Sequence, residues 1–399
     1  VGYLALSGPV AGGEYNVAVG NYTLDALTSG DYNTSLGYQA GSALTTGDRN
    51  VIIGSAAGDS LTTAGSNVII GDEACGGATM TGDYNVAIGR NSGFDMTGAT
   101  KNTLVGFEAG KDLTTTQNST LVGYKAGAVN TAHECTAFGS EAALVNTTGS
   151  GILAIGREAY KTGDDEGHNV AIGLQSMSVG VNGGEYNTAV GNFALQDVTS
   201  GDSNTTVGYK AGKDVSSGSN NVMIGYEAGD DITTGSGVVN IGDGTDNGGN
   251  VNHSIVIGQS ASGKGANTGF ISPNGGAVYQ GNNSTTWSQT SDIRIKKNIK
   301  DNKIGLEKIN KIKVRNFEYK LPEEIIEVPT HAAIKKEGVQ LGVIAQEIQE
   351  VLPDTVVQTT HGVYSVNPDN ITWYLVNAVQ ELSAQVTTLQ NEVNTLKGE

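Results

Sequence analysis

The residues best suited to chemistry lie near position 291, where a serine is followed at close spacing by several cations. The segment runs Ser291-Asp292-Ile293-Arg294-Ile295-Lys296-Lys297-Asn298-Ile299. A serine hydroxyl attacks a peptide carbonyl only when an adjacent base accepts its proton. A lysine can serve as that base only when it is neutral, and burial or nearby cations favour the neutral form. Taken alone, the same nine residues also fit an exposed strand with alternating charges, so this segment leaves both interpretations open.

Two further features follow in the same region. The first is a run from Leu341 to Pro353 that contains Gly342-Val343-Ile344-Ala345-Gln346-Glu347. The second is a predicted helix over 368–397, with Asn367 as its cap and Pro368 in its first turn. Apolar residues recur along this helix at alternating steps of four and three, the spacing of a coiled-coil seam. They are Leu375, Val379, Leu382, Val386, Leu389, Val393 and Leu396.

Together, these three features resemble the intramolecular chaperone domain that ends phage tail spikes, endosialidases and some tail fibres, and that also occurs in the myelin regulatory factor. The resemblance covers residues 291–399. It implies that Ser291 is the nucleophile of a self-cleavage reaction and that Lys296 is its base. It also implies a scissile bond between Thr290 and Ser291, trimerisation through the terminal coiled coil, and cleavage only after the domain has folded and trimerised.

Upstream of this region the sequence is a repeat. The pentads Asn-Val-Ala-Val-Gly at 16–20 and Asn-Val-Ile-Ile-Gly at 50–54 and 67–71 are three of its copies. Their final glycines recur in steps of 16, 17 or 18 residues as far as Gly258, and a large apolar residue precedes each of them. An Ala-Gly half-repeat, as in Ala40-Gly41, and a polar turn complete each unit. Such a fixed period is the sequence signature of a repeat architecture.

A unit of about 17 residues cannot bury its own apolar side, but stacked units form a continuous core. Short β-branched runs bounded by Gly, Asn, Asp and Ser are typical of strands, so we expect two strands of about five residues in each unit. The recurrent glycine indicates a special turn or a close backbone approach. The asparagines that begin the pentads are expected to form a hydrogen-bonded ladder.

The pentad and its half-repeat resemble the head repeats of trimeric autotransporter adhesins, in which three parallel β-rolls pack side by side. This resemblance covers residues 1–260. The expected fold class is therefore mostly β. It comprises a homotrimeric parallel β-roll or solenoid over 1–260, an irregular or interwoven β linker over 261–290, and a small α+β chaperone domain over 291–399 that ends in a trimeric coiled coil.

Composition and charge argue against several classes of function. The chain has 58 Gly, 6 Pro and only 16% charged residues, which favours turn-rich β structure over disorder. Its net charge is −18, and residues 1–290 hold 10 basic and 26 acidic side chains, so binding to nucleic acid is not expected. Membrane insertion, a cofactor and a metal site are not expected either. Cys75 and Cys135 lie about 3.5 units apart, too far for a disulfide, and are predicted to be free thiols.

The predicted function is that of a phage tail fibre. A structural shaft would contact a host-surface receptor, either a glycan or a protein, and would join other tail proteins through residues that precede Val1. The fibre would assemble in the host cytoplasm, belong to the virion, and show no enzymatic activity except a single self-cleavage. Two alternatives stay open: a tail-spike glycan depolymerase and a trimeric bacterial adhesin capped by the same chaperone. A depolymerase needs two carboxylates ~5–10 Å apart, and the nearest candidate, Gly163-Asp164-Asp165-Glu166-Gly167, fits a long turn better.

Overall fold

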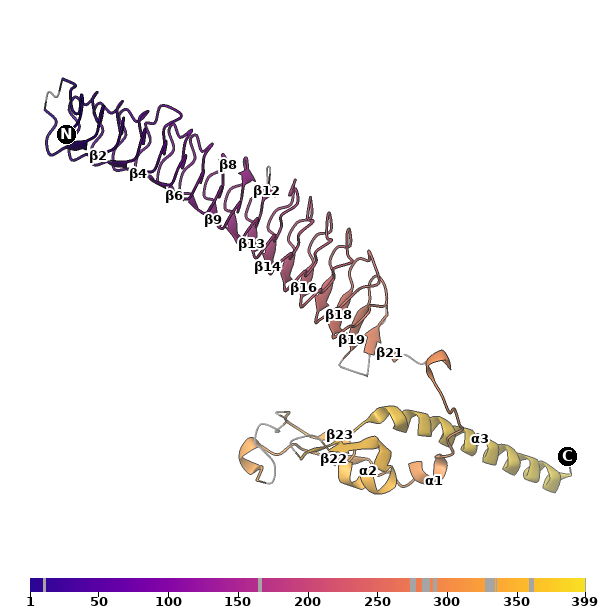
Figure 1. The fold of residues 1–399 in the computed structure, drawn as a ribbon. Helices are drawn as coiled ribbons and strands as arrows, with labels where there is room; N and C mark the ends of the chain where they lie inside the picture. The colour runs from indigo at the N-terminus through magenta and orange to yellow at the C-terminus, as the bar shows by residue number, and fades with distance from the viewer. Residues whose placement is uncertain are drawn as a thin grey trace. The chain divides into compact units, whose positions relative to one another are not determined.

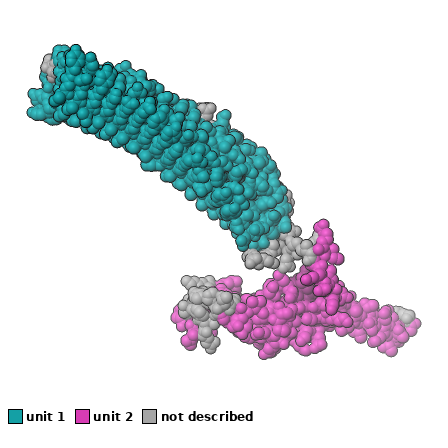
Figure 2. Space-filling view, viewed as in Figure 1, with its two compact units in different colours: residues 1–291 teal, residues 292–399 magenta. Residues whose placement is uncertain are grey.

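The computed structural model describes residues 1–9, 12–163, 167–272, 278–281, 288–289, 293–326, 334, 336–358 and 362–398. The chain forms two compact units, Val1–Ser291 and Asp292–Glu399, which are coloured separately in Figure 2.

The first unit is a β-solenoid built on one 18-stranded sheet, in which coil follows coil along the chain (Figure 1). The strands are, in stacking order, β1 (Val17–Val19), β2 (Thr34–Leu36), β3 (Val51–Ile53), β4 (Val68–Ile70), β5 (Val86–Ile88), β6 (Thr103–Val105), β7 (Thr120–Val122), β9 (Thr136–Phe138), β11 (Leu153–Ile155), β13 (Val170–Ile172), β14 (Thr188–Val190), β15 (Thr205–Val207), β16 (Val222–Ile224), β17 (Val239–Ile241), β18 (Ile255–Gly258), β19 (Gly269–Ser272), β20 (Val278–Gln280) and β21 (Ser288–Gln289).

Equivalent positions of successive repeats pair in parallel, so Val17 lies beside Thr34 and Thr34 beside Val51. The parallel stack continues to β19. β20 then pairs antiparallel with β19, and β21 pairs antiparallel with β20. The expectation of a mostly β, parallel solenoid with coils of about 17 residues is confirmed. The reversal matters because it ends the row of parallel strands within the same sheet instead of leaving β19 as its edge.

Each strand is shorter than the sequence led us to expect, with three residues instead of about five in most coils. Its middle residue points into the coil and is buried, as Ile52 and Leu104 show, while the two flanking residues face outward. A second strand per coil is also not general. Among the described residues it forms only as a three-stranded parallel sheet of β8 (Val129–Asn130), β10 (Val145–Asn146) and β12 (Thr162–Gly163), together with isolated bridges.

Left-handed backbone conformations explain why the second strand is usually missing. In the first coil, Tyr22 has φ 59° and Leu24 has φ 49°, and Tyr32 at the next corner has φ 59°. Residues with positive φ recur at these three places along the solenoid. A residue in this region turns the chain away from the extended conformation, so the coil closes through turns instead of a second strand.

The asparagine ladder predicted from the pentads is present. Nδ2 of Asn33 donates to Oδ1 of Asn16 at 3.1 Å and to the carbonyl of Gly47 at 2.9 Å. Nδ2 of Asn50 donates in turn to Oδ1 of Asn33 at 3.0 Å, and that oxygen also accepts from the backbone N–H of Asn50. These buried amides therefore satisfy each other from coil to coil, which is what a buried polar side chain requires.

The second unit is a small α+β fold. Its elements are η1 (Ile293–Ile295), α1 (Leu306–Ile309), β22 (Arg315–Phe317), η2 (Pro322–Glu324), β23 (Gln340–Gly342), α2 (Ala345–Val351), η4 (Pro353–Thr355), β24 (Val356–Gln358), β25 (Tyr364–Val366) and α3 (Pro368–Lys397). The strands form two antiparallel pairs, β22 with β23 and β24 with β25. The core is a cluster around the buried side chains of Ile348, Leu352 and Tyr374.

Candidate functional site

The predicted nucleophile and the predicted scissile bond, Ser291 and Thr290–Ser291, lie outside the described residues. The predicted base, Lys296, follows the short helical turn η1, and its backbone N–H donates to the carbonyl of Ile293 at 3.1 Å. This turn differs from the exposed strand that was the simpler interpretation of the segment. The Ser291–Lys296 dyad stays a prediction.

The side chain of Lys296 is exposed in the single chain, as are those of Arg294 and Lys297. A lysine acts as a base only when its charge is suppressed, and burial is one of the two ways to suppress it. One chain does not provide that burial. Burial of Lys296 would need contacts that the single chain does not make.

The run from Gly342 to Glu347 has a structural role. It leaves β23, which pairs with β22, and enters α2, whose Ile348 is part of the core. Oε1 of Glu347 forms a 2.7 Å ion pair with Nη2 of Arg315, and this hydrogen bond lowers the pKa of the Glu347 carboxyl. Both side chains are partly exposed, so the pair contributes little stability by itself but joins α2 to β22.

The long helix α3 begins at the predicted cap. The side chain of Asn367 accepts a hydrogen bond from the N–H of Asp369 at 3.0 Å, and Pro368 is the first helical residue. All seven residues of the predicted seam are between 45% and 88% exposed in the single chain: Leu375, Val379, Leu382, Val386, Leu389, Val393 and Leu396. A helix that exposes a seam of this length leaves a surface that association of further copies would bury.

A different face of α3, beside the seam, packs against its own chain. Tyr374 and Ala378 are buried there, and the hydroxyl of Tyr374 donates to the carboxylate of Asp354, which raises the pKa of Tyr374 to about 12. Asn377 and Glu381 lie on this face as well. No pattern in the sequence singled them out, because a polar pair four residues apart is ordinary on any helix surface.

Asn377 and Glu381 bind the backbone that leads into α1. Nδ2 of Asn377 donates to the carbonyls of Asn302 at 3.0 Å and of Ile304 at 3.1 Å. Oε2 of Glu381 accepts from the backbone N–H of Leu306 at 2.9 Å. Three hydrogen bonds from one helix thus hold the segment from residue 302 to residue 306.

The outer face of the solenoid sheet is apolar along its length. In the strands of the 18-stranded sheet from β1 to β18, the third residue is a large apolar side chain that points outward, and several of these side chains are well exposed. Val19, Leu36, Phe138, Ile155, Val207 and Ile224 are each between 38% and 47% exposed. A continuous apolar column of this kind is the feature expected of an association surface.

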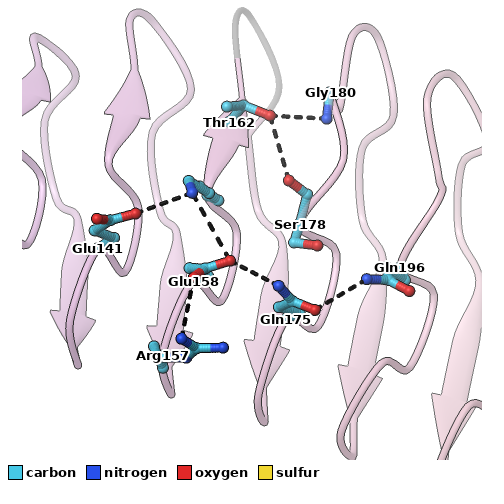
Figure 3. A network of polar contacts seen from close by, with 9 residues as sticks. Glu141, Arg157, Glu158, Thr162, Gln175, Ser178, Gly180 and Gln196 are labelled. Atoms are coloured by element: carbon cyan, nitrogen blue, oxygen red, sulfur yellow. Dashed lines mark hydrogen bonds and ion pairs between the residues drawn. The ribbon is translucent and has the colours of Figure 1, made fainter.

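A polar network crosses several coils near β12, and Figure 3 shows it. Lys161 pairs with Glu141 at 2.9 Å and with Glu158 at 3.7 Å, and Oε2 of Glu158 accepts from Nε2 of Gln175 at 2.7 Å. The hydrogen bond from Gln175 lowers the pKa of Glu158. A glycosidase acid needs a raised pKa, so this network has the character of a ladder that ties coils together. The acidic insertion candidate at 164–166 lies outside the described residues.

One pair of acids was missed by the sequence reasoning. Asp231 and Asp246 lie in neighbouring coils and their side chains share a hydrogen bond. Burial, followed by this hydrogen bond and the charge of Asp246, raises the pKa of Asp231 to about 7. Two carboxyl groups that share a hydrogen bond lie closer together than the ~5–10 Å separation that glycoside hydrolysis requires. The pair therefore gives no support to a depolymerase.

Other kinds of site were assessed over the part of the chain that the structure describes. No group of three or more His, Cys, Asp or Glu in this part is arranged to hold a metal ion. Cys75 and Cys135 are free and buried, and burial raises the pKa of each thiol to about 12. No described helix is both long enough and apolar enough to cross a membrane.

The comparisons with known proteins bear on the second unit. Residues 291–357 match the protein family described as chaperone of endosialidase, Peptidase_S74. No curated protein and no solved structure matches the chain. The matched residues include the Ser291–Ile299 segment, β22, β23 and α2. The chain thus carries a C-terminal intramolecular chaperone domain behind a β-solenoid, the arrangement of a fibre-like or spike-like protein.

Proposed function

We propose that this protein is the shaft of a homotrimeric phage tail fibre whose C-terminal domain assembles the trimer and then removes itself by self-cleavage. The observation that carries the proposal is the match of residues 291–357 to the chaperone family directly after a parallel β-solenoid. A stack of parallel strands is slow to form and prone to errors of register. A chaperone that brings three chain ends together addresses this problem.

Two unpartnered apolar surfaces support the trimer. One is the exposed seam of α3, and the other is the outward column of the solenoid sheet. The half of α3 beyond Leu382 is exposed on all sides in the single chain. Helices without tertiary contacts are marginal in water, so association along the seam supplies what the single chain lacks.

The cleavage step follows from the residues of the dyad. Oγ of Ser291 attacks the carbonyl carbon of Thr290, and the hydroxyl proton passes to the neutral Nζ of Lys296. The bond from this carbon to the amide nitrogen of Ser291 breaks, and the nitrogen takes the proton back from Lys296. An ester now joins Thr290 to Oγ of Ser291. Water hydrolyses this ester and leaves a shaft that ends at Thr290 and a free chaperone that begins at Ser291.

Cleavage makes assembly irreversible in practice. Once the chaperone has left, an unfolded shaft has no element to realign its chains, so its persistence is set by a rate of unfolding and not by an equilibrium. The acidic shaft, part of the virion after assembly in the host cytoplasm, contacts a surface receptor of the host through its polar turns. It joins other tail proteins.

The test is intact mass and denaturing-gel analysis of the full chain beside Ser291→Ala and Lys296→Met. The wild type is expected to yield two products that divide between residues 290 and 291, and both variants are expected to stay whole. Ser288→Ala is the matched control, three residues upstream, and it is expected to cleave normally. If wild-type trimers remain uncut, the self-cleavage proposal is wrong and the domain is a permanent trimerisation cap.

The trimer has its own test. Val386→Asp places a charge in the centre of the seam, and light scattering is expected to show monomers because a buried unpaired charge is costly. Asn391→Asp places the same charge on α3 outside the seam and is expected to stay trimeric. Monomeric wild-type protein, or trimers that survive Val386→Asp, would argue against association through α3.

A further inference from the structure

The two faces of α3 serve different chains. Its exposed seam, which includes Leu375, Val379 and Leu382, does not pack against the core of its own chain. The face with Tyr374 and Ala378 is buried against the same chain. One rigid helix therefore connects the surface that awaits other chains with the interior of its own domain.

The contacts of Asn377 and Glu381 place a third part of the chain on this helix. These two residues are one helical turn apart and hold the backbone between Asn302 and Leu306 with three hydrogen bonds. Asn302 adds a bond of its own, because its Oδ1 accepts from the N–H of Ile304 at 2.8 Å. The side chain of Ile304 packs against the core cluster, so the segment is fixed from both sides.

Gly305 makes this approach possible. A Cβ atom at this position would overlap the carboxylate of Glu381, so a side chain there would displace this carboxylate from its position beside the segment. The close approach of the segment to the helix therefore depends on two residues, a glycine in the segment and an acid on the helix. A contact that depends on both is unlike an incidental surface hydrogen bond.

The held segment begins six residues after Lys296. The chain between them is short, so the position of residue 302 limits where the Lys296 amine can lie relative to the rest of the domain. Small displacements of a reacting group are costly, since a shift of about 1 Å slows a reaction up to about a hundredfold. Order in residues 302–306 therefore restricts the region that the Lys296 amine can occupy.

We propose that Asn377 and Glu381 are positioning residues that couple assembly of the α3 seam to self-cleavage. Association of three helices fixes the position of α3. The hydrogen bonds of Asn377 and Glu381 then restrict the motion of residues 302–306, which follow Lys296 in the chain. Neither residue touches the reacting atoms. The inference rests on the proposed Ser291–Lys296 cleavage and adds to it the connection between the trimer and the dyad.

The experiment follows synthesis of the full chain over time, with light scattering for the trimer and intact mass for cleavage. Asn377→Ala and Glu381→Ala are expected to form trimers as the wild type does. The first-order rate of cleavage within those trimers is expected to fall about tenfold to a hundredfold. Glu381→Gln keeps an oxygen that accepts from the N–H of Leu306, so it is expected to recover most of the rate.

Asn391→Ala is the matched control. Asn391 lies fourteen residues, or two heptads, after Asn377 on the same side of α3, and no contact with the segment 302–306 involves it. This variant is expected to cleave at the wild-type rate. Together with Glu381→Gln, it separates a lost positioning contact from general damage to the helix.

Three results would overturn the inference while leaving the proposed cleavage intact. The alanine variants could cleave at the wild-type rate in their trimers. Their cleavage could fall only in proportion to a loss of trimers, which would make the contacts merely structural. Asn391→Ala could slow cleavage as much as Asn377→Ala does. A wild type that forms trimers and never cleaves would instead overturn the proposed self-cleavage, and this inference with it.

Discussion

The hydroxyl of Tyr160 lies 3.4 Å from Nδ2 of Asn169, at the place where the asparagine ladder of the solenoid resumes. In regular coils this amide donates to the asparagine one coil earlier. Here the preceding ladder position is Ile152, which has no acceptor. The fully buried Tyr160 accepts the hydrogen bond instead. Where the ladder resumes after Ser119, Cys135 and Ile152, a tyrosine hydroxyl thus takes the place of the missing acceptor.

Tyr160→Phe is expected to weaken the solenoid locally. The substitution keeps the ring and removes the acceptor, and a single buried hydrogen bond contributes about 0.5–1.5 kcal/mol. Asn169 keeps its other bond, to the carbonyl of Gly184 at 2.8 Å, so the effect should stay at the lower end. Amide hydrogen exchange measures it as faster opening of β11 and β13. Unchanged protection there would mean that the hydroxyl contributes nothing to stability.

The glycine after each strand gives a second prediction. Gly106 has φ +140°, and a Cβ atom on it would overlap the carbonyl of Gly123 in the next coil. Gly106→Ala is expected to destabilise the coil by about 1–3 kcal/mol, because both the backbone conformation and the stacking distance must change. Thermal unfolding of the full chain provides the measurement.

Gly98→Ala is the control for this substitution. Gly98 has no positive φ of this kind, and the nearest atom to its added Cβ is 3.9 Å away, on Thr115. We expect a change of less than about 0.5 kcal/mol, as for most surface substitutions. Equal effects of the two alanines would show that the glycines of the pentads are not kept for stacking.

The period of the solenoid could be read from the sequence because each coil repeats the same local chemistry. The recurring Asn and Gly define the register, and the structure pairs Val17 with Thr34 as that register requires. The second strand was predicted wrongly because non-glycine residues such as Tyr22 and Leu24 take positive φ. Leucine and tyrosine carry no signal for that conformation, which stacking imposes from the neighbouring coils.

The candidate site was less accessible to sequence reasoning. The seam of α3 follows from spacing alone, since a heptad marks it wherever the helix lies. The contacts of Asn377 and Glu381 join residues about 75 positions apart in the chain, as with Glu381 and Leu306. Such a pair has no local pattern. Only the fold brings the glycine at 305 and the acid at 381 together.

Asn240 is a residue whose substitution is expected to raise stability, unlike the substitutions of Tyr160 and Gly106. It occupies the inward position of β17, where most other coils have an apolar residue, and it is fully buried. Neither its Oδ1 nor its Nδ2 has a hydrogen-bond partner among the described residues. A buried unsatisfied polar group costs about 1–3 kcal/mol. Asn240→Leu is therefore expected to raise the unfolding temperature.

Asn221→Leu is the matched comparison for Asn240→Leu. Asn221 is also fully buried, but its Nδ2 donates to Gly235 at 2.8 Å and its Oδ1 accepts from the N–H of Val238 at 2.9 Å. Removal of this amide leaves two backbone groups without partners, so the unfolding temperature is expected to fall. If Asn240→Leu also lowers the unfolding temperature, the amide of Asn240 is satisfied in solution, for example by a buried water.

The pair of Asp231 and Asp246 predicts a dependence of stability on pH. In the folded chain the pKa of Asp231 is raised from 3.8 to about 7, so between these values the folded state holds a proton that the unfolded state has lost. Stability from this group is therefore complete below pH 3.8 and is lost as the pH rises towards 7. Because Asp231 is exposed, screening by solvent reduces the effect to about 1 kcal/mol. Asp231→Asn and Asp246→Asn each remove the pair and should make the solenoid about equally stable at pH 5 and pH 8, as thermal unfolding would measure. A wild type that loses no stability between these two values, or variants that keep its full loss, would show that the two carboxyls do not share a proton.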